Sequence, residues 1–270
     1  LSGKGKYDES GNLESFAPSN HVLGLARLEG RKVVVVSDDF TIRGGSSEAA
    51  VAEKWIYADR YAYEYQLPLV RIVHSAGGSV KLLQQMGYTK IPGYALLPSV
   101  PLLGVTPVVG IVMGPAAGLG AIRACNSHFS IMVRGQGQVF AGGPPVVKQA
   151  LGLTVDKEAL GGYGVHKASG VINNFAATDQ EALELAKCFL SYLPRNVFEQ
   201  PPLGATSDAP SRADPWLNDA IPRERRKVYD PRKILASVFD KGSVFELTPY
   251  FGGSLVTCLA RLHGYVVGVM

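Results

Sequence analysis

The chain has 270 residues, 46% of them hydrophobic, so it can form one large domain or two small ones around a sizeable core. Its net charge is only +4, and its one dense basic run is Arg-Glu-Arg-Arg-Lys at 223–227. Nucleic-acid-binding proteins usually carry a basic face with aromatic residues among the charges. We therefore expect no nucleic-acid partner and interpret this run as a solvated linker, or alternatively as a contact for an acidic partner or a phosphate.

Cysteine usage and hydropathy exclude two further classes. Cys125, Cys188 and Cys258 lack metal-ligand spacing, and their odd number argues against a disulfide scaffold, so we expect a reducing compartment and no metal. The uncharged stretch 91–122 resembles a membrane segment, but five prolines interrupt it. No proline-free span in it approaches the roughly 20 residues of a transmembrane helix. We expect it to form buried strand, turn and helix start, with no membrane partner.

Strand and helix patterns alternate along the first two thirds of the chain. The apolar runs at 32–40, 67–78 and 106–117 predict buried strands, and 129–140 predicts a strand followed by an extended piece. The segments 46–66, 118–124, 144–151 and 178–194 predict helices, the last beginning at Thr178 or Asp179. This alternation predicts βαβ units with a parallel sheet, that is, an α/β fold.

The alternating strand and helix patterns end after Pro194. Five prolines between 201 and 222 predict an extended linker that ends near Arg226, and 230–247 resumes helix and strand patterns. Leu-Ala-Arg-Leu then recurs: it occurs at 25–28 and at 259–262, each time followed by glycine two positions later and by a valine-rich strand. We interpret the echo as an internal duplication, with coincidence as the alternative.

Three glycine-rich turns follow predicted strands, at 43–46, 75–79 and 114–120. None is a phosphate-binding P-loop or a dinucleotide-binding fingerprint. Such turns can be demanded by packing alone, but in open α/β folds ligands gather at these strand ends, and glycine lets backbone N–H groups approach a ligand. Two converging N–H groups would hold an oxyanion. This pattern suits chemistry through an enolate.

The sequence shows few candidates for catalytic side chains. Five histidines are scattered along the chain, and we interpret His74, beside a glycine loop, as structural, with a place near a ligand as the alternative. Ser75 lacks the G-x-S-x-G elbow of a nucleophilic serine. We interpret Asp38 and Asp39 as turn or helix caps.

In combination, several motifs resemble the carboxyltransferase (β) subunits of biotin-dependent acyl-CoA carboxylases of the propionyl-CoA and methylcrotonyl-CoA type. They are DDFTIRGGS (38–46), GPAAGLGA (114–121), AGGPPVVK (141–148), LGGYGVHKASGV (160–171), DPRKILASVFDKGSVFEL (230–247) and VTCLARLHG (256–264). The resemblance covers nearly the whole chain.

The resemblance implies a crotonase-like N-domain, a ββα superhelix at 1–200. It implies a linker at 201–226 and the start of a second, duplicated domain of the same kind at 227–270. It further implies that the chain is incomplete at both ends and inactive alone. Apolar residues after Tyr250, such as Val256, Leu259 and Val266, are then expected to face water.

The implied reaction moves a carboxyl group from carboxybiotin, carried by a partner, to an acyl-CoA such as propionyl-CoA or methylcrotonyl-CoA. Both enolates would be held in backbone oxyanion holes. By motif, the thioester hole falls at Gly118 and Leu119, and the biotin hole beyond Met270. Acyl-CoA contacts fall at Gly44, Gly45 and Ser46, at Gly77 and Gly78, and at Gly142 and Gly143.

The resemblance also implies partners and a location. These are a biotin carboxylase that uses ATP and bicarbonate, a biotin carboxyl carrier subunit, and copies of the chain forming dimers that assemble into a hexamer. The expected compartment is the cytoplasm or the mitochondrial matrix.

The sequence departs from the family pattern in three motifs, and two alternatives to a carboxylase subunit stay open. The chain has AAGLGA where the family commonly has CAGGA, SAGGS in place of SGGA or SGGG, and LGGY in place of LGGA. A biotin-dependent decarboxylase that runs the transfer backwards, for example on glutaconyl-CoA, is one alternative. A non-catalytic assembly subunit is the other.

Overall fold

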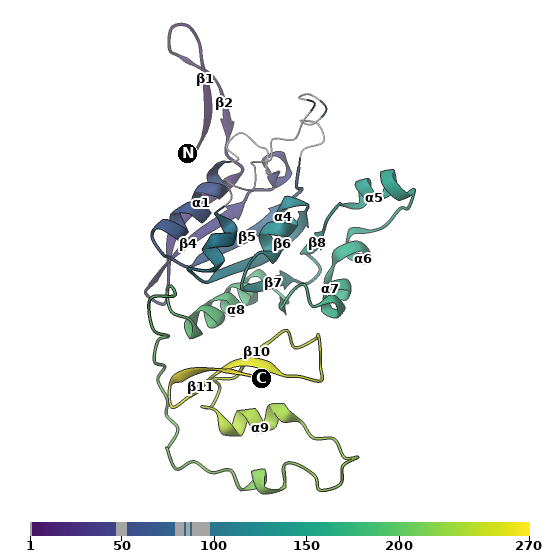
Figure 1. Ribbon diagram of the computed structural model, residues 1–270. Coiled ribbons are helices and arrows are strands. Elements are labelled where there is room, and N and C mark those ends of the chain that lie inside the picture. The colour runs from purple at the N-terminus through teal and green to yellow at the C-terminus, as the bar shows by residue number, and fades with distance from the viewer. Residues whose placement is uncertain (1, 47–52, 79–83, 85–86, 88–97) are drawn as a thin grey trace.

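A computed structural model describes residues 2–46, 53–78, 84, 87 and 98–270 (Figure 1). The strands are β1 (Gly3–Tyr7), β2 (Leu13–Pro18), β3 (His21–Leu28), β4 (Arg31–Asp38), β5 (Leu69–Ser75), β6 (Val108–Ala117), β7 (Phe129–Val133), β8 (Gln138–Phe140), β9 (Asn174–Ala176), β10 (Phe245–Leu247), β11 (Thr257–Leu262) and β12 (Tyr265–Val269). The helices are α1 (Glu53–Glu64), α3 (Ser99–Leu103), α4 (Leu119–Cys125), α5 (Pro144–Leu151), α6 (Lys157–Gly161), α7 (Tyr163–Ser169), α8 (Asp179–Tyr192) and α9 (Pro231–Val238), with short 3-10 turns η1 (Arg43–Gly45) and η3 (Pro215–Asp219).

A seven-stranded sheet forms the centre of the molecule, in the order β3-β4-β5-β6-β7-β9, with β8 beside the end of β6. From β4 onward the strands are parallel, and only the edge strand β3 runs antiparallel. The predicted βαβ alternation is confirmed. The predicted helix at 46–66 is confirmed from Glu53 onward, and residues 47–52 lie outside the described part of the chain.

Helices cover both faces of this sheet (Figure 1). Val33 packs with α8 on one face, whereas its neighbour Val34 packs with α1 and α3 on the other, because successive strand residues point to opposite sides. Both valines are fully buried. Thr178 begins α8 as its cap, its side chain accepting from the Glu181 N–H, as predicted.

The two copies of Leu-Ala-Arg-Leu have the same local structure. Each forms the end of the first strand of an antiparallel hairpin, β3–β4 or β11–β12. Both two-residue turns have positive φ throughout: 50° and 82° at Glu29 and Gly30, 51° and 81° at His263 and Gly264. Such turns match the right-handed twist of the flanking strands. The likeness supports the duplication, which stays a prediction.

The C-terminal strands pack on the sheet domain. Phe245 of β10 joins the core beneath α8, 5.5 Å from Phe129 between ring centroids, and Leu259 and Val266 pack against the same core. The expectation that Leu259 and Val266 would face water was therefore wrong. Asn174 of β9 adds two hydrogen bonds, to Glu246 O and from Thr248 N. Residues from β10, β11 and β12 thus share a hydrophobic core with the central sheet and α8.

Two parts project from this body: the β1–β2 hairpin, for which the sequence pattern gave no prediction, and the arm that carries α5 (Figure 1). No residue of α5 is buried. Among the described residues, no helix is both long and apolar enough to cross a bilayer.

Candidate functional site

The glycine-rich loops lie at one edge of the central sheet. Because β4, β5, β6 and β8 are parallel, their carboxyl ends point the same way. The loops that follow them therefore meet, as ligand-binding loops do in open α/β sheets. They are 43–46 after β4, 76–78 after β5, 118–120 after β6 and 141–143 after β8. The predicted site residues of all four loops thus come together, although they span a hundred residues of sequence.

Direct contacts link the first two loops. Ser75 Oγ donates to Gly45 O at 2.7 Å, and the Ala76 N–H donates to Gly44 O at 2.8 Å. A Cβ at Gly45 would lie 2.2 Å from His74 O, so only glycine fits there. Ser75 is fully buried, and its hydroxyl supports the loop, so it is no candidate for a nucleophile.

The β6 loop packs equally closely against its neighbours. A Cβ at Gly77 would lie 2.7 Å from Ala117 O, and one at Gly120 would lie 2.7 Å from Ser75 Cβ. Gly118 has φ 52° and ψ −116°, a conformation open to glycine and costly for other residues, and α4 begins immediately after it. These close approaches hold the loops against one another.

Hydrogen bonding distinguishes the two predicted oxyanion donors, the N–H groups of Gly118 and Leu119. The Gly118 N–H donates to Phe140 O at 3.1 Å and is therefore occupied. Leu119 is the first residue of α4, and the first N–H groups of a helix have no acceptor within that helix. The Leu119 side chain packs against the core beneath α1, so it finds room away from the loop. Leu119 is thus the better donor of the two.

The predicted contact residues differ in accessibility. Gly78 is exposed, and Gly44, Gly118, Leu119, Gly142 and Gly143 are half-buried. Gly45, Ser46 and Gly77 are buried. Ser46 O accepts from Asn20 Nδ2 at 2.5 Å, which ties this loop to the start of β3. The buried members therefore shape the loops, while the others can reach a ligand.

Beneath the loops, Asp38 lies at the centre of a buried ionic cluster. Its Oδ1 accepts from Arg123 Nη1 at 2.8 Å and from His21 Nδ1 at 2.9 Å, and its Oδ2 accepts from the His74 N–H at 3.2 Å. The Asp38, His21 and Arg123 side chains are at most 4% exposed. Asp38 is therefore no cap, contrary to the prediction, whereas Asp39 does cap a turn by accepting from Thr41.

The charges in this cluster follow from burial and pairing. Burial alone would raise the pKa of Asp38, but the Arg123 charge and the His21 hydrogen bond outweigh it and lower the pKa to about 2. Burial lowers the pKa of His21 more than its bond to Asp38 raises it. Near neutral pH the cluster is thus a carboxylate, a guanidinium and a neutral imidazole.

The sequence pattern did not identify this cluster, although one signal was present. Residues that face each other in a two-residue hairpin lie equally far from its turn, and His21 and Asp38 are equally far from the turn at Glu29 and Gly30. The Leu-Ala-Arg-Leu-Glu-Gly phrase could therefore have placed His21 opposite Asp38. Nothing in the sequence pattern pointed to Arg123, which comes from a helix 85 residues away.

His74 lies between this cluster and the loops. Its ring stacks on Phe40 with centroids 4.0 Å apart, and burial lowers the pKa of His74. A Cβ on Gly114 would lie 2.3 Å from the imidazole. The ring is half-buried, so the structural interpretation and a place at the edge of a ligand site are both compatible with it. Among the described residues, no group of three or more His, Cys, Asp or Glu side chains could hold a metal.

Tyr163, the residue at which the LGGY motif departs from the family pattern, packs away from the glycine loops. Tyr163 packs edge-on to Phe175 and Tyr250, with centroids 4.9 and 6.4 Å away, and Lys167 and Arg134 lie over its ring. Its N–H donates to Glu158. Tyr163 therefore links α7 to the C-terminal segment.

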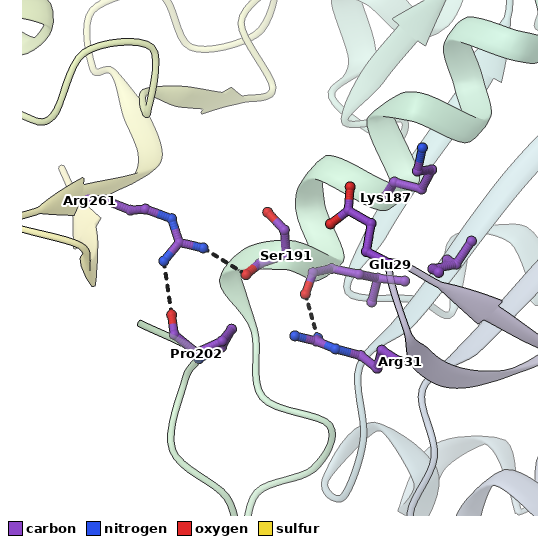
Figure 2. A pocket seen from close by; sticks show the side chains of 8 residues that line it. Glu29, Arg31, Lys187, Ser191, Pro202 and Arg261 are labelled. Atoms are coloured by element: carbon purple, nitrogen blue, oxygen red, sulfur yellow. Dashed lines mark hydrogen bonds between the residues drawn. The ribbon is translucent and has the colours of Figure 1, made fainter. Parts of the chain in front are cut away.

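A separate pocket lies at the amino end of the strands (Figure 2). Arg31 donates to Leu190 O and Leu193 O, both at 2.6 Å, and Arg261 donates to Ser191 O and Pro202 O at 2.8 and 2.9 Å. These arginines satisfy carbonyls at the C-terminus of α8. Arg31 and Asp38 are at opposite ends of β4, about 23 Å apart at a rise of about 3.3 Å per residue. This pocket is distinct from the loop site.

The chain is similar in sequence to several known proteins. It is 32% identical over 252 residues to methylmalonyl-CoA decarboxylase subunit alpha of Veillonella parvula, covering 92% of this chain and 49% of that protein. It is also 32% identical over 267 residues to the mitochondrial propionyl-CoA carboxylase beta chain of Homo sapiens, covering 98% and 49%. The chain thus spans about half the length of these relatives.

A solved structure of a related enzyme also matches the fold of this chain. The transcarboxylase 12S structure with hydrolysed methylmalonyl-coenzyme A bound superposes with a TM-score of 0.84 at 30% identity, covering 94% of this chain and 50% of that one. The predicted crotonase-like α/β fold is confirmed by this match. The model of the carboxyl transferase domain matches residues 8–270, and the chain belongs to that family.

Proposed function

We propose that this chain supplies the acyl-thioester site of a biotin-dependent carboxyl transferase that acts on a short acyl-CoA, propionyl-CoA first and methylcrotonyl-CoA second. The observation that carries the proposal is the convergence of four glycine loops at the carboxyl edge of the sheet, with the Leu119 N–H at the first position of α4. Family membership supports the same reading.

The reaction exchanges a proton for a carboxyl group at the acyl α-carbon, or at the vinylogous γ-carbon of methylcrotonyl-CoA. Removing that proton places negative charge on the thioester oxygen. The Leu119 N–H would donate to this oxygen, together with the exposed backbone at Gly78. Preorganised donors of this kind act where charge develops, so they lower the barrier more than they strengthen substrate binding. No side chain of the site is needed as a base, because the biotin left when carboxybiotin gives up its carboxyl group as CO2 would accept the α-proton.

The remaining predicted contacts have supporting roles in this proposal. Gly44, Gly142 and Gly143 are half-buried at the rim of the loops, where they could follow the coenzyme A portion of the substrate. Gly45, Ser46 and Gly77 are buried and would hold the loops in register. Gly118 would orient Leu119 through its positive φ.

Carboxybiotin, delivered by a carrier subunit, would supply the carboxyl group. A biotin carboxylase that uses ATP and bicarbonate would recharge the carrier, and copies of the subunit would assemble as an oligomer. The transcarboxylase 12S structure is described as a hexamer assembly with substrate binding to a multienzyme core, which supports the oligomer.

A decarboxylase is the second candidate. It is favoured by the relative named as methylmalonyl-CoA decarboxylase subunit alpha. The same oxyanion donors would serve it, since decarboxylation of an acyl-CoA passes through the same thioester enolate. Only the net direction of transfer separates the two.

The test is an assay of the intact enzyme with its biotinylated carrier. Propionyl-CoA, methylcrotonyl-CoA and methylmalonyl-CoA would be offered separately, and 14C-labelled carboxyl groups followed in both directions. Transfer to propionyl-CoA or methylcrotonyl-CoA supports the first candidate, and net loss from methylmalonyl-CoA supports the second. Absence of transfer in both directions, with an active carrier, would leave the non-catalytic assembly subunit.

A further inference from the structure

We infer that Asp38 is a positioning residue for the proposed thioester site, an inference that rests on the function proposed above. Its carboxylate joins three of the elements that carry the glycine loops. It is the last residue of β4, it accepts from the backbone of β5, and it accepts from the Arg123 guanidinium on α4.

Each contact of Asp38 is made close to a loop. The His74 N–H is bound one residue before Ser75, whose hydroxyl donates to Gly45 O. On the β4 side, the Asp39 N–H donates to Asn20 O, and the Asn20 side chain donates to Ser46 O. The carboxylate is therefore connected to the 76–78 loop through His74 and to the 43–46 loop through His21, whose neighbour Asn20 donates to Ser46 O.

The contact with Arg123 bears directly on the proposed oxyanion donor. Arg123 follows Leu119 by four residues, about one turn of α4. Fixing the guanidinium against Asp38 therefore sets the rotation of the helix whose first N–H is that of Leu119. The guanidinium also lies 5.2 Å from the centroid of the buried Trp55 ring on α1, which limits its movement on that side.

A second buried ion pair provides a matched control. Asp59 pairs with Arg71 at 2.9 Å, and both side chains are at most 2% exposed. Asp59 binds Ser99 as its other partner, while Arg71 donates to Arg123 O and Asn126 O at the far end of α4 from Leu119. Asp59 contacts none of the four glycine loops through these bonds. Neutralising it disturbs a buried pair of the same kind without releasing the loops.

The experiment compares Asp38→Asn with Asp59→Asn in the 270-residue chain and in the intact enzyme. Backbone amide hydrogen exchange is measured in peptides that cover 74–78 and 118–122. We expect Asp38→Asn to raise exchange there at least tenfold, and Asp59→Asn to leave it within threefold of wild type. In the intact enzyme, Asp38→Asn should lower kcat at least tenfold and change KM for propionyl-CoA less than threefold.

A third variant separates positioning from stability. In Asp38→Asn/Arg123→Met the unpaired buried cation is removed as well, so the chain should regain most of its urea midpoint, whereas the link between β4, β5 and α4 stays broken. We expect kcat to stay low. Recovery of kcat, or equal loop exchange in Asp38→Asn and Asp59→Asn, would overturn the inference. If the wild-type enzyme transfers no carboxyl group, the proposed function fails, and the exchange comparison still decides whether Asp38 positions the loops.

Discussion

Arg123 on α4 and Asp38 at the end of β4 form an ion pair with an N–O distance of 2.8 Å, although 85 residues separate them in the chain. Both side chains are at most 4% exposed. A buried charge that loses its partner is costly, because neither water nor another ion replaces the lost contact. The pair therefore connects the stability of the domain to the geometry of the loops above it.

Arg123→Met should lower the free energy of unfolding by about 3–5 kcal/mol, because it leaves the Asp38 carboxylate buried with only a neutral partner. Urea denaturation followed by tryptophan fluorescence measures this. The control is Arg232→Met, which removes a pair with Glu246 whose arginine is 45% exposed. It should cost less than about 1 kcal/mol. Equal losses in the two variants would contradict the assignment of a buried pair.

Stability should fall as the pH is lowered from neutral. The pKa of Asp38 is lowered from 3.8 to about 2 and that of His21 is lowered from 6.5, so the unfolded chain binds more protons than the folded chain. The Asp38 contribution, about 2 kcal/mol, is present above pH 3.8 and is lost as the pH falls towards 2. The His21 contribution is lost as the pH falls below 6.5. In His21→Gln, urea midpoints measured between pH 7 and pH 5 should fall less than in wild type.

Gly118→Ala should reduce carboxyl transfer a hundredfold or more. The backbone there has φ 52° and ψ −116°, so a side chain strains it and turns the Leu119 N–H, and loss of one oxyanion donor typically costs that much in rate. The nearest atom to the added Cβ is Ala141 O at 3.6 Å, so the effect is not a clash. Gly135→Ala is the control, with φ 75° and nothing within 4 Å. Turnover of both variants in the intact enzyme decides the point; near-normal transfer by Gly118→Ala would mean that the donor lies elsewhere.

Phe245→Ala should destabilise the whole chain by about 3–5 kcal/mol, because Phe245 fills the core against Phe129, and Tyr192 lies beside it. Trp55 lies on α1 and Trp216 lies in η3, so their fluorescence and the far-UV signal report on different parts of the chain. All should change in one urea transition, shifted in Phe245→Ala. Tyr265→Ala, at a side chain 65% exposed, should shift it little. Two separate transitions in wild type would contradict a shared core.

The strands and helices of the sheet could be predicted because local sequence signals are enough to determine them. The run at Val33–Val36 is apolar on both faces, as a strand covered by helices on both sides requires, and Thr178 is a favourable cap. The glycine loops were also predictable, since parallel strands bring their carboxyl ends to one edge whatever lies between them.

Long-range choices were not predictable in the same way. Nothing local in Asp38 distinguishes a turn cap from a buried ion-pair partner, because the difference depends on where α4 places Arg123. Leu259 and Val266 have a strand pattern, but which surface covers them depends on the position of Phe245 beneath α8. The occupied N–H of Gly118 depends on β8, a strand of three residues that pairs with the end of β6. Tertiary contacts between distant parts of the chain determine these three features.

In the proposed site, the thioester oxygen of an acyl-CoA accepts a hydrogen bond from the Leu119 N–H. The most direct measurement is the carbonyl 13C chemical shift of [1-13C]propionyl-CoA bound to the intact enzyme, since a hydrogen bond to the oxygen polarises the carbonyl and moves its signal downfield. We predict a downfield shift on binding that persists in Gly135→Ala and is lost in Gly118→Ala. An unshifted carbonyl in the bound wild type, or a shift that survives unchanged in Gly118→Ala, would contradict the account.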